Sequence, residues 1–352
     1  MKLFSKLSYF QKILTLLIIA AIISVVSVFY YTLKKIYLPN VIISNQSEKY
    51  LYIPTGSNFD DVCRILYQHH FIINLSSFEW LAEKKNYTGH IKPGKYKLKN
   101  RMNNNELIRF LRSGKQEPVK LSLNNIRTLN QLAGTVGHHI EADSASILQI
   151  LNDPIILNSI GFDRKNILAM IIPNTYEFNW NTNAVGFIKR MSREFHKFWD
   201  PERLENSKKT GLTPVQVMIL ASIIHEETNN SSEYPTIAGV YINRLKREMP
   251  LQADPTIKFV AGDFSLKRIL HKYIEINSPF NTYLNKGLPP GPISMPSLKA
   301  IEGVLHYEKH NYLYFCAKSD SSGNHVFAKT LIQHNQNAKE YQKWLDKRKI
   351  FD

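Results

Sequence analysis

A run of 21 residues near the N-terminus, residues 13–33, carries no charged side chain. As an α-helix it would be about 32 Å long at roughly 1.5 Å per residue, which is enough to cross the hydrocarbon core of a bilayer. A cleaved signal peptide has an apolar stretch of only about 7–15 residues and a small-residue cleavage site. Tyr30 and Tyr31 at the end of the run are typical of an uncleaved signal anchor. A buried core helix is the alternative, although core helices rarely stay uncharged for this length.

Lysines flank the apolar run on both sides. Three precede it and two follow it directly, which favours a cytoplasmic N-terminus: Lys2, Lys6 and Lys12, then Lys34 and Lys35. Most of the chain would then lie outside the cytoplasm. Its formal charge of +16 suits an anionic partner. Outside the cytoplasm, nucleic acid is disfavoured as that partner, and lipid headgroups or cell-wall polymer are expected instead.

The remaining sequence predicts an α+β protein with a 43% apolar composition typical of folded chains. The expected divisions are a short cytoplasmic tail (1–12), a transmembrane signal anchor (13–33), a linker (34–47), a small α+β module (48–118) and a mixed α+β domain (119–352). In the module we expect a strand at 48–53, a helix at 59–67, a helix that Ser76 and Glu79 begin with a capping box, a strand after the turn at 92–96 and a helix at 105–111.

The larger domain begins with helical patterns and ends with a hairpin. Helices are expected at 128–136, 144–151, 183–199 and 338–349, an extended segment at 172–177 and hairpin strands at 312–318 and 325–329. In the helix at 183–199, one apolar stripe predicts a core face: Phe187, Met191, Phe195 and Phe198. Residues 288–292 (LPPGP) exclude both helix and central strand.

Neither a metal nor a cofactor is expected from the residue pattern. Cys63 and Cys316 are the only cysteines, and two distant cysteines form no framework, so both are predicted to be free and buried. The segment HEETN lacks the second histidine of the HExxH zinc motif. His306 and His310 have ligand spacing, but without an evident third ligand they are interpreted as a surface pair.

One helix of the larger domain is unusually well marked. Thr213 is a suitable N-cap, Pro214 suits the first helical position, and Gln216 completes a capping box. Residues 215–224 are almost all apolar, so the helix should be buried on most sides. It ends in three consecutive polar residues, His225, Glu226 and Glu227.

Glu227 is the candidate catalytic residue of this helix. It lies one turn beyond Ile223 and Ile224, where partial desolvation would raise its pKa towards that of a general acid usable at neutral pH. Glu226 lies about 100° away around the helix and should face different surroundings. The spacing alone leaves open the alternative that these polar residues only end a core helix.

Amide, hydroxyl and aromatic side chains recur in the loops that follow. Such residues in rigid loops are typical of a sugar-binding cleft, because they pair with hydroxyl and N-acetyl groups while aromatic rings stack on pyranose faces. The segments are YINRL (241–245), LQADPT (251–256), SPFNTY (278–283) and GLPPG (287–291). Each segment alone is weak support for such a cleft.

Taken together, these motifs resemble the endolytic murein transglycosylase (YceG-like) family. The resemblance covers roughly residues 45–345, and GLPPGPI together with LQADPT is its most specific part. The matching segments are ASIIHEET, AGVYINRL, LQADPT, SPFNTY and GLPPGPI, with PGKY, IPNTYEF, YLYF, His325 and His334-Asn335 as further matches.

The resemblance implies a lyase of the bacterial inner membrane with a single span and a LysM-like module before the catalytic domain. Such an enzyme cuts the β-1,4 bond between N-acetylmuramic acid and N-acetylglucosamine inside nascent peptidoglycan strands. It leaves a 1,6-anhydro end, and termination of strand elongation is one consequence of the cut. Glycan strands and the membrane are the implied partners, and peptidoglycan synthases are candidate partners.

The family's catalytic acid is the second glutamate of an E-x-E-T pattern, which falls on Glu227. His225 replaces the first glutamate of that pattern, and Asn174 replaces the aspartate of a frequent Pro-Asp-Thr, so no role is carried over to either position. The resemblance and the residue types together give five candidate substrate-binding residues: Asn243, Gln252, Asp254, Asn281 and Tyr283.

A single carboxyl is sufficient for this chemistry. Ordinary glycosidases need a second carboxylate as nucleophile or base. In a lytic transglycosylase the muramic acid 6-hydroxyl is the nucleophile, and one glutamate acts first as acid and then as base. Two alternatives remain: a hydrolytic muramidase that uses water with Asp254 or Glu226, and a non-catalytic peptidoglycan-binding scaffold.

Overall fold

A computed structural model of the chain describes residues 8–43, 49–266, 269–320 and 322–348. Their contacts form two compact units. Unit 1 holds the described residues up to Val119 together with Asn179–Asn181, and unit 2 holds those from Lys120 onward apart from that short segment. The division falls one residue after the expected boundary at 118/119. The mixture of helices with short strands confirms the α+β class.

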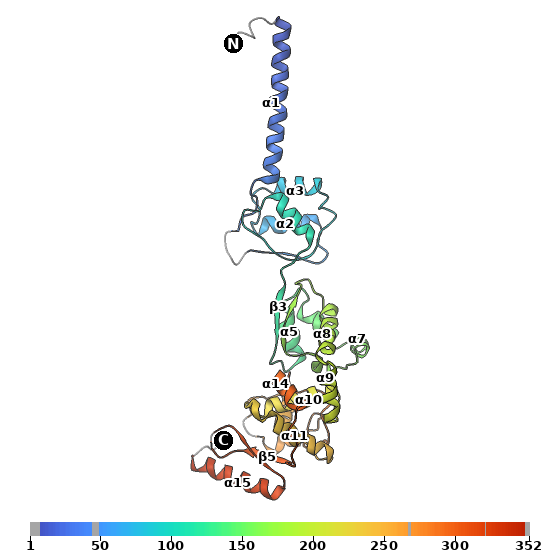
Figure 1. The fold of residues 1–352 in the computed structure, drawn as a ribbon, viewed down its shortest axis with the longest axis vertical. Coiled ribbons are helices and arrows are strands. Elements are labelled where there is room, and N and C mark those ends of the chain that lie inside the picture. The colour runs from blue at the N-terminus through green and yellow to red at the C-terminus, as the bar shows by residue number, and fades with distance from the viewer. Residues whose placement is uncertain (1–7, 44–48, 267–268, 321, 349–352) are drawn as a thin grey trace. The chain divides into compact units, whose positions relative to one another are not determined.

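Unit 1 contains a long helix and a small module. Its elements are α1 (Tyr9–Tyr37), β1 (Tyr50–Ile53), α2 (Phe59–Gln68), α3 (Leu75–Lys84), β2 (Gly94–Lys97) and α4 (Asn104–Ser113). Helix α1 is a single rod of 29 residues, none of which is buried (Figure 1). By length and composition it is long and apolar enough to cross a membrane. It begins at the capping box of Ser8 and Gln11.

Helix α1 extends four residues beyond the expected span of 13–33 at each end, so the last part of the expected tail 1–12 is helical. Residues 1–7, with Lys2 and Lys6, lie outside the described residues. The expected linker 34–47 is also corrected, because 34–37 are helical and Asn40 and Val41 are buried in the module. Residues 44–47 are not among those described.

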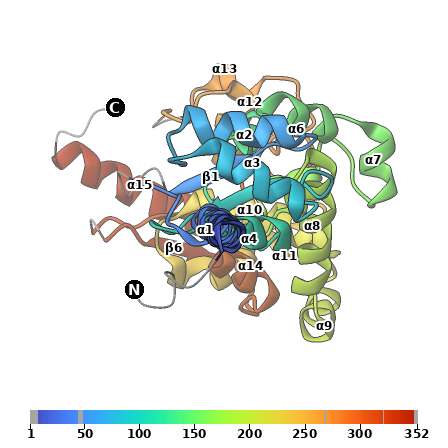
Figure 2. The same cartoon turned by 90° about the horizontal axis from the view of Figure 1, so that it is seen from above.

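A buried amide network attaches the end of α1 to the module. The Asn104 amide donates to the Lys35 carbonyl at 2.9 Å, and the Asn40 amide donates to Asn104 Oδ1 at 2.6 Å. Asn40 also donates to the Asn74 carbonyl at 2.9 Å. Figure 2, in which α1 is seen end-on, shows α3 and α4 beside it, in agreement with their contacts. Helix α1 and the module are therefore continuous in packing.

The module packs three helices against one antiparallel strand pair. β1 and β2 pair from Tyr50 opposite Lys97 to Ile53 opposite Gly94. The core is apolar and includes Leu51, Ile53, Val62, Leu66, Phe78, Tyr96, Leu107 and Leu111. The expected strand at 48–53 is found from Tyr50, and Glu48 lies outside the described residues. The predicted helix start at Ser76 is wrong. Asn74 is the cap, because its side chain accepts from the Ser77 amide at 2.8 Å.

Unit 2 is mostly helical. Its elements are β3 (Val119–Leu123), α5 (Leu129–Gly137), α6 (Ser144–Leu151), α7 (Pro154–Ser159), η3 (Ile167–Met170), β4 (Asn174–Phe178), α8 (Ala184–Phe198), α9 (Pro201–Thr210), α10 (Pro214–Glu227), η4 (Ser231–Glu233), α11 (Tyr234–Lys246), α12 (Asp254–Ala261), α13 (His271–Ile274), α14 (Leu298–Leu305), β5 (Tyr314–Ala317), β6 (His325–Ala328) and α15 (Leu331–Lys347). β3 pairs with β4, and β5 pairs antiparallel with β6.

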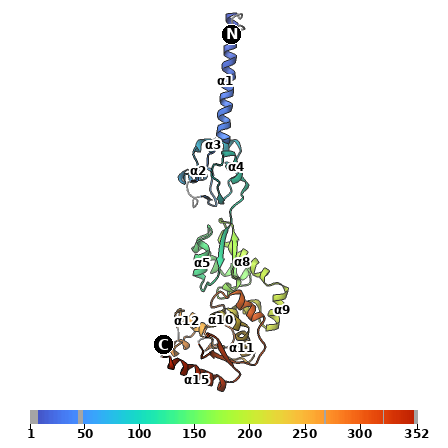
Figure 3. The same cartoon turned by 60° about the vertical axis from the view of Figure 1, so that its left-hand side comes forward.

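Helix α10 is the centre of unit 2. The capping box of Thr213 and Gln216 and the proline at the first position are present as predicted, and every residue from Val217 to Ile224 is buried. The helix packs against α11, α14, α9 and α12 (Figure 3). Burial on all sides explains why no amphipathic pattern marks this helix.

Most other expectations in unit 2 are confirmed, with two exceptions. Phe187, Met191 and Phe195 are buried, but Phe198 is partly exposed and the neighbouring Trp199 is buried instead. The C-terminal helix begins at Leu331 rather than at residue 338, where the side chain of Thr330 caps it. Residue 349 of the expected helix lies outside the described residues. The predicted hairpin is present as β5 and β6.

The GLPPGPI loop and the residues that follow it contact α10 and the segments that precede α5 and η3. The Ile293 amide donates to the buried Ser222 hydroxyl at 3.1 Å, and the Met295 amide donates to the Ile126 carbonyl at 2.7 Å. Gly291 passes so close to the Lys165 backbone that a Cβ there would lie 1.8 Å from the Lys165 carbonyl oxygen. Only glycine therefore fits at this contact.

We expect Gly291→Ala to destabilise unit 2 by about 1–3 kcal/mol or more, because the loop must move away from Lys165. Thermal denaturation of the detergent-solubilised chain measures this change. The matched control is Gly134→Ala in α5, where a Cβ meets nothing within 4 Å. That control should be neutral or raise stability by up to about 1 kcal/mol. Equal melting temperatures for the two variants would contradict the close contact.

Candidate active site

A pocket of about 470 Å³ lies at the C-terminal end of α10 in unit 2. Its walls come from α10, α11, the start of α12, the β5–β6 hairpin and α15. The polar and aromatic residues that line it are Glu227, Tyr241, Arg244, Gln252, Asp254, Tyr283, Tyr314, Phe315, His325, His334 and Tyr341. Four of the six predicted site residues meet here, from three separate parts of the sequence: Glu227, Gln252, Asp254 and Tyr283.

Glu227 is the last residue of α10 and remains partly accessible to solvent. Its pKa rises from the ordinary 4.5 to about 8, mainly because of desolvation and in smaller part because of the nearby Asp254 side chain. The Tyr241 hydroxyl donates a hydrogen bond to Glu227 Oε1, which opposes this rise. At neutral pH the Glu227 carboxyl is therefore mainly protonated, and it can donate a proton to a ligand in the pocket.

Tyr241 is a buried residue of α11 that holds Glu227 in place. Burial and the adjacent Glu227 carboxylate raise the pKa of its hydroxyl well above the ordinary value, so it stays protonated and acts as a donor. Its ring packs edge-on against Phe315 of β5, with 5.9 Å between the centroids. The hydroxyl is hydrogen-bonded to one carboxyl oxygen of Glu227, so the other oxygen is left for a ligand.

A second tyrosine–carboxylate pair lies in the same pocket. The Tyr283 hydroxyl donates to Asp254 Oδ1, and Asp254 is the first residue of α12. Burial is the main reason why the pKa of Tyr283 is raised, with Asp254 adding to it. The Asp254 side chain is exposed at the pocket wall. The pocket thus places a carboxylate with a hydrogen-bond donor near the neutral carboxyl of Glu227.

Backbone bonds join the LQADPT and SPFNTY segments. The Gln252 amide donates to the Thr282 carbonyl at 3.0 Å, and the Ala253 amide donates to the Thr282 hydroxyl at 3.0 Å. The hydroxyls of Thr256 and Thr282 are 2.8 Å apart and buried. Gln252 has a φ of +51°, a left-handed conformation that is strained for a residue other than glycine. The two segments form one rigid wall that carries Gln252, Asp254 and Tyr283.

Arg244 joins this wall to the hairpin. Its buried guanidinium donates to the carbonyls of Leu313 at 2.7 Å, Leu251 at 2.8 Å and Pro250 at 3.1 Å. The same group donates to Gln252 Oε1 at 3.3 Å. Desolvation lowers the pKa of Arg244 from its ordinary value, but the group remains a cation. Arg244 therefore fixes the pocket walls and supplies positive charge beneath them.

Asn243 and Asn281 do not line the pocket. The Asn243 amide donates to the carbonyls of His310 at 2.8 Å and Tyr312 at 3.0 Å. The buried Asn281 amide donates to the carbonyls of Ile274 and Ile276, and its oxygen accepts from the Tyr283 amide at 2.9 Å. Both side chains hold backbone segments that carry other pocket residues, so any contribution to the site is indirect.

Glu226 has different surroundings from Glu227, as the helical geometry predicted, and the same is true of His225. Glu226 forms a salt bridge with Arg127 at 2.9 Å. His225 Nδ1 is 3.3 Å from the Tyr234 hydroxyl, and desolvation is the main cause that lowers its pKa. Neither residue lines the pocket of Glu227. His225, where the sequence departs from the expected pattern, therefore contributes no side chain to this pocket.

Sequence reasoning missed Tyr241 as the partner of Glu227 and gave no role to the hairpin residues. His325 lines the pocket with its Nδ1 2.9 Å from Glu233 Oε2, and its backbone amide donates to Glu233 Oε1 at 2.7 Å. His334 and Tyr341 reach the pocket from α15. The signal for His325 and His334 was present in the motif match, but only the fold shows that they meet Glu227.

The cysteines and the two spaced histidines lie in different surroundings. No group of three metal-binding side chains occurs within the described ranges. Cys63 is free and buried as predicted, whereas Cys316 is free but only half-buried, at the pocket wall. His306 is exposed beside Glu302. His310 differs from the predicted surface pair, because its Nε2 lies 2.9 Å from the Thr236 carbonyl and it is partly buried.

A neutral carboxyl, a protonated tyrosine and a second carboxylate in one aromatic pocket define a general acid–base site. A family model described as the YceG-like family matches residues 51–340. The chain belongs to this family.

Similar proteins share most of this chain. An endolytic murein transglycosylase of Bacillus subtilis (strain 168) is 32% identical over 305 residues, covering 82% of the chain and 83% of that protein. An endolytic murein transglycosylase of Streptococcus pneumoniae serotype 2 (strain D39 / NCTC 7466) is 29% identical over 331 residues, covering 85% of the chain but 60% of that protein. A crystal structure of a YceG-like protein from Listeria monocytogenes is 30% identical, with a TM-score of 0.54, and covers 82% of this chain and 98% of that one.

The raised pKa of Glu227 predicts a pH-dependent cost in stability. The folded chain binds the Glu227 proton more tightly than the unfolded chain does. This proton therefore contributes its full stability below about pH 4.5, and the contribution is lost as the pH rises through about 8. Glu227→Gln removes the dependence. We therefore expect the melting temperature of Glu227→Gln, relative to that of the unaltered chain, to increase between about pH 5 and pH 9. The increase should be roughly 2–4 °C for each 1 kcal/mol of unfolding free energy.

The control for this experiment is Glu205→Gln, at an exposed carboxyl of α9. Its melting curve should follow that of the unaltered chain across the same pH range. A constant difference between Glu227→Gln and the unaltered chain at every pH would show that Glu227 titrates alike in the folded and unfolded states.

Proposed function

We propose that this chain is an endolytic peptidoglycan lytic transglycosylase in which Glu227 is the single acid/base. The observation that carries the proposal is the neutral carboxyl of Glu227 in a pocket lined by amide and aromatic side chains. Membership of the YceG-like family and the names of the relatives support it. The substrate is a glycan strand of alternating N-acetylglucosamine and N-acetylmuramic acid.

The proposed reaction begins with proton transfer from Glu227 to the oxygen that links muramic acid C1 to the next sugar. The C1–O bond breaks, and positive charge develops on the muramic acid ring. The muramic acid 6-hydroxyl then bonds to C1, and Glu227, now a carboxylate, takes the hydroxyl proton. The carboxyl returns to its protonated state, no water is consumed, and the product has a 1,6-anhydro end.

The other pocket residues bind and position the sugar in this proposal. The Gln252 amide and the Tyr283–Asp254 pair supply hydrogen bonds from the rigid wall. Asn243 and Asn281, predicted as binding residues, act through the backbone that they hold. The Asp254 carboxylate, in the same pocket as Glu227, would stabilise positive charge on the ring, which favours the transition state over the bound substrate.

Helix α1 is proposed as a single span in the bacterial inner membrane, with the N-terminus in the cytoplasm and unit 2 outside it. The lysine distribution supports this orientation, and a membrane tether would keep the enzyme near nascent strands. Peptidoglycan synthases, which produce those strands, are the proposed protein partners. Termination of strand elongation would follow from each cut.

A hydrolytic muramidase is the second candidate function, and a specific observation favours Asp254 over Glu226 as its base. Asp254 shares the pocket with Glu227, whereas Glu226 is engaged by Arg127 elsewhere. If a water that Asp254 activates replaced the 6-hydroxyl, the product would carry a reducing muramic acid end. A non-catalytic peptidoglycan-binding scaffold would release neither product.

Glu227→Gln keeps the shape of the pocket but removes the proton donor. We expect release of anhydro-ended fragments from sacculi to fall by at least about 10²–10⁴-fold. Mass spectrometry of the digests measures it and distinguishes anhydro from reducing ends. Glu226→Gln is the matched control and should retain activity within about threefold. Full production of anhydro ends by Glu227→Gln would refute the assignment.

Tyr241→Phe removes the hydrogen bond that favours the charged form of Glu227. The pKa of Glu227 should rise by about one to two, since a hydrogen bond to a charged group is worth about 1.5–3 kcal/mol. The alkaline limb of the kcat/KM profile for anhydro-end release should therefore move to higher pH. An alkaline limb that moves to lower pH would contradict this role of Tyr241.

A further inference from the structure

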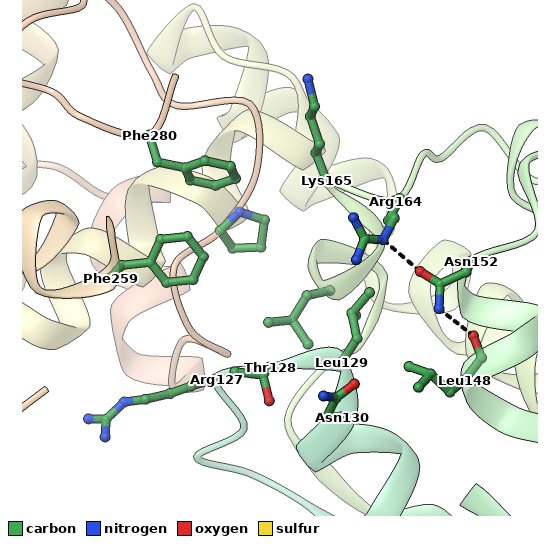
Figure 4. A pocket seen from close by; sticks show the side chains of 12 residues that line it. Arg127, Thr128, Leu129, Asn130, Leu148, Asn152, Arg164, Lys165, Phe259 and Phe280 are labelled. Atoms are coloured by element: carbon green, nitrogen blue, oxygen red, sulfur yellow. Dashed lines mark hydrogen bonds between the residues drawn. The ribbon is translucent and has the colours of Figure 1, made fainter. Parts of the chain in front are cut away.

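Unit 2 contains a second pocket of about 400 Å³ that the proposed reaction does not use. We call it the basic–aromatic pocket. It is lined by the side chains of Thr128, Asn130, Arg164, Lys165, Phe259 and Phe280, among others (Figure 4). None of these residues lines the pocket of Glu227.

Figure 4 shows two aromatic rings on one side of this pocket and two cations on the other. The rings of Phe259 and Phe280 are 4.9 Å apart between centroids, and both are half-buried. Arg164 and Lys165 are exposed across from them. Such an arrangement fits a ligand with an apolar part and at least one carboxylate or phosphate.

The charge of Arg164 and Lys165 is available to a ligand. Arg164 donates through Nε to Asn152 Oδ1 at 2.6 Å, which orients the guanidinium while both terminal nitrogens remain able to donate. Among the described residues, neither cation forms a salt bridge. Arg127 also lines the pocket but is different, because Glu226 already balances its charge.

Two segments line both this pocket and the pocket of Glu227, and the end of α10 reaches this pocket only through a salt bridge to Arg127. At the end of α10, Glu227 lines its own pocket, and Glu226 forms a salt bridge with Arg127, which lines the basic–aromatic pocket. On α12, Asp254 and Phe259 line different pockets and are separated by about 7.5 Å of helical rise. The loop at 278–283 gives Phe280 to one and Tyr283 to the other. The two pockets therefore lie on two sides of one shared wall.

We infer that the basic–aromatic pocket binds the acidic stem peptide of the strand whose sugars occupy the pocket of Glu227. This inference rests on the proposed function, since the stem is attached to muramic acid. Stem carboxylates would pair with Arg164 and Lys165, and alkyl side chains would pack on Phe259 and Phe280. An extended peptide of four or five residues spans roughly 13–17 Å, about twice the helical rise between Asp254 and Phe259 on the two sides.

Stem recognition would give the enzyme a substrate preference that sugar contacts alone do not provide. A strand with stems would engage both pockets at once, while a strand without them would engage only the pocket of Glu227. The preference should appear in binding as well as in cleavage, because neither cation touches the reacting atoms. It should also weaken at high salt, since both contacts are charged and near the surface.

The experiment compares binding of glycan strands that carry stems with the same strands after an amidase has removed them. It uses the full chain in detergent with Glu227→Gln, so that no turnover interferes. We expect the stem-bearing strands to bind about tenfold more tightly. Adding Arg164→Ala and Lys165→Ala should reduce the difference to within about twofold and leave binding of the stem-free strands unchanged.

The matched control replaces Lys208 and Lys209 of α9 by alanine, which removes the same charge at exposed positions outside both pockets. This control should keep the full preference. Equal binding of both strand types, or a preference that survives in the Arg164/Lys165 variant, would overturn the inference. Because binding is measured without cleavage, a failure of the proposed reaction would appear separately, as the absence of anhydro ends from the catalytically intact chain.

Discussion

The hydrogen bond between the Tyr241 hydroxyl and the Glu227 carboxyl joins two helices at the point where a buried helix meets a polar pocket. Burial disfavours the charged form of Glu227 and raises its pKa, whereas the hydrogen bond from Tyr241 lowers it. The pKa therefore stays within reach of neutral pH, and the carboxyl can both give up and take back a proton. The packing of unit 2 keeps the Tyr241 hydroxyl and the Glu227 carboxyl in contact. The capping box fixes the start of α10, Ser222 ties the GLPPGPI loop to its middle, and α11 and α14 pack along it. A carboxyl in such surroundings reduces stability but supplies a usable proton.

Several polar residues of the recognised motifs build the pocket by holding its backbone segments, and of these only Arg244 also lines it. Arg244, Asn243 and Asn281 each bind two or more backbone carbonyls, because buried peptide groups outside regular structure need partners. The loops that they hold carry the residues that face the pocket. Loss of one such amide would displace Tyr283 or the hairpin, and binding would suffer without any direct contact to the sugar.

Local patterns predicted much of this fold, because they depend on neighbours in the sequence. The capping signals of α10 and the 100° rotation that separates Glu226 from Glu227 were predictable in this way. Partnerships between distant residues were not, such as Tyr241 with Glu227 or Tyr283 with Asp254, since the chain must fold before they meet. Competing local signals caused the error at α3, where Asn74 caps the helix ahead of the Ser76–Glu79 pattern. The ends of α1 were missed because a limit based on charge ignores two features: the capping box of Ser8 and Gln11 at its start and the Asn104 contact at Lys35 near its end.

The account depends most on the protonation state of one carboxyl. Infrared difference spectra between the unaltered chain and Glu227→Gln isolate the carbonyl band of a protonated Glu227. The band should be present at neutral pH and should disappear with a midpoint near pH 8, in line with the pKa of about 8 for this carboxyl. A carboxyl already ionised at neutral pH, with its midpoint near the ordinary value of 4.5, would contradict the assignment of Glu227 as the proton donor.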